Sequence, residues 1–149
     1  MALIDQVTKD MAQAMKAHDQ PRLAALRMLK SAIMNREVEK GRGLEPTEDM
    51  QVVQQAVKQR RDSIEQFKAA GRTDLVDKEA AEMAVLDAFL PPAASAAEID
   101  AAVAAAITET GATSAKDMGK VMKAVMPKLA GKSADGRAVN EAVRRSLGA

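Results

Sequence analysis

The scarcity of aromatic residues limits what this chain can fold into more than any other feature. Only Phe67 and Phe89 are aromatic, although hydrophobic residues make up 47% of the 149 residues. Alanine, leucine, valine and methionine supply most of the others. Alanine, leucine and methionine favour helices, whereas the aromatic residues that favour strands are almost absent. The composition therefore predicts an all-α protein with enough apolar surface for a core.

Apolar residues recur at three- and four-residue steps, which is the spacing of one helix face. Prolines, glycines and short polar capping residues divide the pattern into seven predicted helices, four longer and three shorter. In chain order, the predicted inward positions are Ile4, Val7, Met11 and Met15; Leu23, Leu26, Leu29 and Ile33; Val53, Val57, Ile64 and Phe67; Leu75, Glu79, Met83, Leu86 and Leu90; Ile99, Val103 and Ile107; Met118, Val121, Met122, Val125, Met126 and Leu129; and Val139, Val143 and Leu147.

The pair Pro91-Pro92 marks the predicted domain boundary, because neither proline donates a backbone hydrogen bond and each disfavours helix before it. Ser95 and Glu98 then form a capping-box signal that starts a new helix. The sequence thus predicts a four-helix N-terminal bundle over residues 1–91 and a small three-helix, tail-like C-terminal domain over residues 92–149.

The residue types needed for most catalytic or metal sites are missing. The chain has no cysteine and a single histidine, His18, which is expected to be an exposed turn residue. No metal site or cofactor site is predicted. Paired acids such as Glu48 and Asp49 lie among Lys and Arg and read as solvated surface pairs, and no nucleotide-binding or nucleophile motif is present. No catalytic residue is therefore assigned, and function is expected to lie in binding.

The predicted location is the cytoplasm. Lack of cysteine fits a reducing compartment, and the first residues meet charge at Asp5 without the apolar stretch of a signal peptide. No apolar run approaches the roughly 20 residues that span a bilayer, so no membrane association is expected.

Positive charge is concentrated near the C-terminus. Residues 1–90 hold 14 basic and 15 acidic residues, and residues 91–112 hold three acidic residues and no basic ones. Residues 113–149 hold eight basic and three acidic residues, a net charge of +5. Such a segment can bind a phosphate backbone, although a solvated helix face gives the same pattern. The basic residues are Lys116, Lys120, Lys123, Lys128, Lys132, Arg137, Arg144 and Arg145.

Several segments together resemble the YqeY-like family (the GatB/YqeY domain). The most specific are DMGKVMKAVMPKL at Asp117–Leu129 and GKSADGRAVN at Gly131–Asn140. RMLKSAI at Arg27–Ile33, RRDSIEQF at Arg60–Phe67 and EMAVLDAFLP at Glu82–Pro91 agree with it. The resemblance covers nearly the whole chain.

This family is similar to the C-terminal tail of the B subunit of the tRNA-dependent amidotransferase, a carbon–nitrogen ligase with glutamine as amido-N-donor. The resemblance implies a two-part helical fold and makes tRNA the leading partner. Gly119-Lys120, Gly131-Lys132 and Val139-Asn140 match the motif positions of that tail, so the resemblance implies that Lys120 and Lys132 contact phosphates. Together with Asn140, the basic residues above form the candidate RNA-binding set. Gly119 and Gly131 would allow tight turns or close helix approach, and Asn140 is expected to satisfy backbone groups near the Gly136 turn. The catalytic domains of the amidotransferase have no counterpart in these 149 residues.

Three hypotheses follow. The chain is a tRNA-binding or tRNA-associated accessory module that is not catalytic alone, a protein–protein interaction adaptor with no RNA role, or a component active only within an amidotransferase complex.

Overall fold

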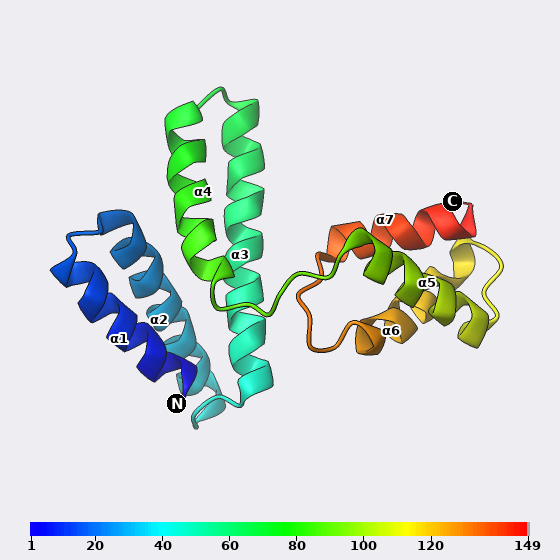
Figure 1. The fold of residues 1–149 in the computed structure, drawn as a ribbon, viewed down its shortest axis with the longest axis horizontal. Coiled ribbons are helices and arrows are strands. Elements are labelled where there is room, and N and C mark those ends of the chain that lie inside the picture. Colours follow the sequence, from blue (N-terminus) through cyan, green and yellow to red (C-terminus); the bar gives the residue numbers. More distant parts are fainter. Residues whose placement is uncertain (149) are drawn as a thin grey trace. The chain divides into compact units, whose positions relative to one another are not determined.

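The computed structural model describes residues 1–148 and is helical throughout its regular structure (Figure 1). No strand occurs in this range, and the only extended pairing is an isolated bridge between Ala93 and Ser133. The all-α prediction is therefore confirmed. The chain divides into two compact units, Met1–Leu90 and Pro91–Ala149, and each is built around its own apolar cluster.

Unit 1 contains the four longer helices, and local chemistry explains where they begin and end. Asp19 accepts a hydrogen bond from the Arg22 amide at 3.2 Å and so caps the second helix, which ends at Gly41 in the left-handed conformation (φ 68°). Glu45 and Glu48 form a reciprocal capping box on the third. The helices are α1 (Leu3–Lys16), α2 (Gln20–Lys40), α3 (Pro46–Ala69) and α4 (Thr73–Asp87).

Helix α2 lies at the centre of unit 1, because it packs against α1, α3 and α4. All four positions predicted for its inner face are at most 4% exposed: Leu23, Leu26, Leu29 and Ile33. The prediction for α1 was wrong at its last position. Met15 is 56% exposed, while Ala14 is fully buried in its place. An i, i+4 step from Met11 to Met15 drifts off a 3.6-residue period, and a step of three keeps the stripe facing α2.

Unit 2 contains α5 (Ala96–Thr110), α6 (Met118–Lys128) and α7 (Gly136–Leu147), with a 3-10 turn, η1 (Ala115–Asp117), leading into α6. The Ser95 hydroxyl accepts the Glu98 amide at 3.1 Å, as the capping-box signal predicted. Pro127 tightens the end of α6, where the Leu129 amide bonds to the Met126 carbonyl three residues back at 3.2 Å.

Valines form the core of unit 2. Val103, Val121, Val125, Val139 and Val143 are all fully buried. The methionines of α6 lie at the margin of this core: Met118 and Met122 are partly buried. Met126 is 49% exposed, so its predicted inward position was wrong.

A buried charged cluster in unit 1 was not predicted. Arg60 on α3 and Glu82 on α4 are 5% and 4% exposed, and Arg60 Nε lies 3.5 Å from a Glu82 carboxylate oxygen. Glu79 lies 3.8 Å from the same nitrogen. One signal was visible in the sequence, because Arg60 continues the helical spacing of Val53, Val57 and Ile64 and therefore occupies an inward position.

Candidate nucleic-acid interface

All eight basic side chains of the candidate set are exposed, and Asn140 is half-buried. They come from three parts of unit 2. Lys116 lies in the turn η1, Lys120, Lys123 and Lys128 lie on α6, and Lys132 lies in the connection to α7. Arg137, Asn140, Arg144 and Arg145 lie on α7.

Three of these cations are paired with the acidic residues of α5. Lys132 Nζ lies 2.5 Å from Glu98, Lys128 Nζ lies 2.7 Å from Glu109, and Arg145 lies 3.6 Å from Asp100. The hydrogen bond from Lys132 holds the pKa of Glu98 below its usual range. The acidic segment at 91–112 and the basic segment that follows it therefore neutralise each other in part.

Backbone hydrogen bonds, as well as the ion pair of Lys132 with Glu98, hold the connection between α6 and α7 in place. Gly131 has a φ of +85°, a conformation that favours glycine. The Ser133 amide donates to the Pro92 carbonyl at 3.0 Å, and the Ser133 carbonyl accepts from the Ala94 amide at 2.7 Å. The first residues of unit 2 are thus bonded to the Gly-Lys-Ser connection, which gives this motif a structural role.

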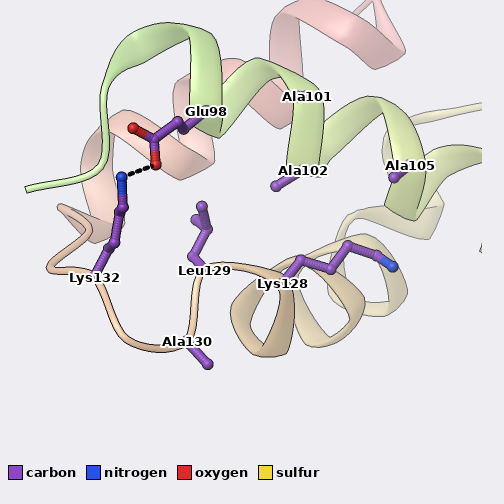
Figure 2. A pocket seen from close by; sticks show the side chains of 8 residues that line it. All are labelled: Glu98, Ala101, Ala102, Ala105, Lys128, Leu129, Ala130 and Lys132. Atoms are coloured by element: carbon purple, nitrogen blue, oxygen red, sulfur yellow. Dashed lines mark ion pairs between the residues drawn. The ribbon is translucent and has the colours of Figure 1, made fainter.

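A shallow cavity of about 370 Å³ lies between α5 and the end of α6 (Figure 2). Alanines and Leu129 supply its apolar lining, and Lys128 and Lys132 lie at its two ends. Figure 2 shows the two ammonium groups pointing away from each other, with Lys132 meeting Glu98. Both lysines are already paired with carboxylates of α5, so the cavity carries no free positive charge.

Four cations have no acidic partner in the part of the chain that the structure describes: Lys116, Lys120, Lys123 and Arg144. Lys120 and Lys123 are three residues apart on α6 and lie on its exposed side, away from the buried Val121 and Val125, while Lys116 is exposed in η1, the turn that leads into α6. We call these three residues the α6 lysine row. Arg144 lies in the last turn of α7. In Figure 1 that turn and the segment entering α6 lie at the same end of unit 2.

Two expectations for neighbouring residues were wrong. Gly119 lies in α6, and a Cβ atom at this residue would meet no other atom within 4 Å, so the glycine allows neither a tight turn nor a close helix approach. The Asn140 side chain makes no hydrogen bond to the Gly136 turn within residues 1–148. Asp135 already serves that turn, because its carboxylate accepts the Arg137 amide at 3.0 Å.

Across residues 1–148, no three His, Cys, Asp or Glu side chains gather as they would around a metal ion. In the same range, no helix combines the length and the apolar character needed to cross a membrane. The fold and these side chains define an all-α protein of two compact units, with an exposed basic surface on the second.

Comparison with known proteins assigns the family. The family described as Yqey-like protein matches residues 4–147, so this chain belongs to the YqeY-like family, as the sequence motifs indicated. A similar protein is "Altered inheritance of mitochondria protein 41, mitochondrial" of Lachancea thermotolerans, with 38% identity over 104 residues that cover 68% of this chain and 56% of the relative. The protein of that name in Pyrenophora tritici-repentis is 29% identical over 99% of this chain and 82% of its own length.

These names correct the predicted location. They describe the relatives as mitochondrial, which contradicts the cytoplasmic expectation. The features behind that expectation, a lack of cysteine and of a signal-peptide pattern, do not distinguish the cytoplasm from other reducing compartments. In the Lachancea thermotolerans comparison the matched region spans just over half of the relative.

Proposed function

We propose that this protein is a tRNA-binding or tRNA-associated accessory module and is not catalytic alone. The observation that carries the proposal is the α6 lysine row: three exposed cations on α6 and on the turn that leads into it, with no acidic partner among the described residues. The similarity of the YqeY-like family to the tail of the amidotransferase B subunit supports tRNA as the polyanion that these lysines bind. An amidotransferase complex is the setting in which such a module would assist carbon–nitrogen ligase chemistry.

The proposed mechanism is electrostatic. Lysine ammonium groups contact phosphates and release condensed counterions, which gives affinity without reading bases. Unit 2 contains no aromatic residue, because Phe67 and Phe89 both precede Pro91. Bases therefore have no aromatic side chain to stack on, and folded RNA recognised by shape is favoured over a single strand.

The test is fluorescence anisotropy of labelled total tRNA, titrated with the full chain over a range of salt concentrations. Lys120→Ala/Lys123→Ala removes two unpaired cations, and the negative slope of log K against log salt should become shallower by about 1.4 to 1.8. Lys128→Ala/Lys132→Ala is the matched control, because it removes the same charge from residues already paired with Glu109 and Glu98.

The control should change the slope by less than half as much, since a phosphate must first displace a carboxylate from each of those lysines. Equal effects of the two double variants would refute the assignment to the α6 lysine row. Absence of saturable binding by the unaltered protein at low salt would refute tRNA binding itself.

We also propose that residues 1–91 and 92–149 are separate domains, the first a four-helix bundle and the second a three-helix tail. Two separate apolar clusters support this division. The hydrogen bonds that join Ser133 with Pro92 and Ala94 support a hinge no later than Pro91.

A protein–protein adaptor is the second candidate, and one observation favours it. Met34 and Val38 on α2 are 48% and 81% exposed, which leaves apolar surface on a helix that is buried along its other side. A partner that stays bound in a pull-down after nuclease treatment and at high salt would support this alternative over tRNA.

A further inference from the structure

The buried Arg60 is poorly supplied with hydrogen-bond acceptors. Its Nε lies 3.5 Å and 3.8 Å from the carboxylates of Glu82 and Glu79 and makes no hydrogen bond in the described part of the chain. Its Nη2 donates to the Met28 sulfur at 2.9 Å. A thioether is a weak acceptor, so a buried guanidinium has one of its donors on a poor partner.

Met28 is open to solvent even though its sulfur contacts a buried group. Its exposed fraction is 54%, close to the 56% of Met15 and the 48% of Met34. Neither of those sulfurs accepts a hydrogen bond from any residue of the described chain. The three side chains are therefore matched in access and differ in what surrounds the sulfur.

We propose that Met28 is a site of oxidation by a hydroperoxide and that Arg60 holds the resulting sulfoxide. In the reaction with hydrogen peroxide, a sulfur lone pair attacks one peroxide oxygen, an S–O bond forms and the O–O bond breaks. The sulfur is oxidised by two electrons and the peroxide is reduced. The departing oxygen takes up the proton of the transferred oxygen and leaves as water.

The product changes the partner of Arg60. A sulfoxide oxygen is a much stronger acceptor than a thioether, and hydrogen bonds from a charged donor are the strong ones. Methionine oxidation usually disrupts packing because it introduces a polar group. At Met28 the same change supplies an acceptor to an under-bonded buried cation, so oxidation there stabilises unit 1.

Two variants of the full chain isolate this site. Met34→Leu keeps Met28 as the exposed methionine in the middle of α2, and Met28→Leu keeps Met34 instead; both retain the other methionines. Each is treated with hydrogen peroxide, its sulfoxides are mapped by peptide mass spectrometry, and its thermal unfolding is measured before and after. The change in Tm on oxidation should be more positive, by about 4 °C or more, in the variant that retains Met28.

Equal changes in Tm, or a more negative change when Met28 is present, would overturn the proposal. So would a Met28 that stays reduced under conditions that oxidise Met34.

Glutamine provides a second measurement that needs no oxidant. It has nearly the helix propensity of methionine and carries an amide oxygen where a sulfoxide would carry its own. Met28→Gln should raise Tm relative to Met34→Gln, its control on the same helix. A Tm for Met28→Gln at or below that of Met34→Gln would show that Arg60 does not use an oxygen acceptor at this position.

Discussion

Replacing Arg60 with methionine removes the positive charge from the interior of unit 1 and leaves Glu82 behind. The Glu82 side chain is 6% exposed, and its carboxylate lies 3.5 Å from Arg60 Nε. Glu79 is less affected, because 22% of its side chain is exposed and it lies farther away, at 3.8 Å. The perturbation is therefore the loss of a partner for one buried carboxylate.

The expected cost is about 3–5 kcal/mol, the range measured when one member of a buried ion pair is removed. That is a large share of the roughly 5–13 kcal/mol expected for a domain of about 90 residues. The double variant Arg60→Met/Glu82→Leu removes both charges and fills similar volume with apolar atoms. Because the desolvation of two ions is then avoided, its stability should be close to that of the unaltered protein or above it.

Urea unfolding followed by circular dichroism measures both variants. With a slope of about 1–3 kcal/mol per molar urea, the single variant should unfold at a midpoint lower by 1 M or more. Recovery in the double variant then gives the coupling between the two sites. If the single variant costs less than about 1 kcal/mol, or if the double variant is as unstable as the single one, Arg60 and Glu82 do not form an energetically coupled buried pair.

Two further predictions concern the termini of helices. Hydrogen bonds from Arg42 and Lys40 hold the pKa of Glu48 well below its usual range, so its stabilising contribution is present above the unfolded pKa and is lost as the pH falls toward the folded one. Glu48→Gln should therefore destabilise the protein at pH 7 in urea titrations, and the difference in stability from the unaltered protein should narrow progressively as the pH falls below about 4 toward the lowered pKa of Glu48. A difference that does not depend on pH would contradict this. Gly131→Ala should lower the free energy of unfolding by about 1 kcal/mol, because φ at Gly131 is +85°. Gly119→Ala should raise it by up to about 1 kcal/mol, because Gly119 is helical and a Cβ atom there would meet open space. Thermal unfolding of both variants tests this, and changes of the opposite sign would contradict the reasoning.

Local patterns in the sequence were enough to predict the helices and most of the inward faces. Leu23, Leu26, Leu29 and Ile33 are all buried, and Gly41 ends their helix in the left-handed conformation expected of it. The buried face and the end of this helix depend on residues a few positions apart in the sequence, and the helix period determines which of them share a face. The helix period predicted the wrong residue at the edge of one face, where Met15 is exposed and Ala14 is buried in its place.

The polar interior could not be predicted from local patterns. Arg60 follows the apolar spacing of α3, but a cation in such a position indicates burial only if a carboxylate from another helix reaches it. Glu82 supplies that carboxylate from α4. Its four-residue spacing from Leu86 places it on the inward face, but nothing near it in the sequence shows that Arg60 is its partner. Tertiary packing decides which charged residues are enclosed, and the sequence alone does not contain that pairing.

The same reasoning changes which residues should be tested for binding. Counted along the chain, the eight basic residues of 113–149 are equivalent in charge, and the family resemblance implies phosphate contacts for both Lys120 and Lys132. In the fold, α5 brings Glu98, Asp100 and Glu109 against three of them. Such exposed pairs are each worth at most about 1 kcal/mol, so they add little stability. Their larger effect is on the electrostatic potential, because they lower it beside α5, whereas the α6 lysine row has no acidic partner among the described residues. Under the proposed function, the acidic residues of α5 would therefore direct a polyanion to the α6 lysine row rather than to the basic side chains beside α5.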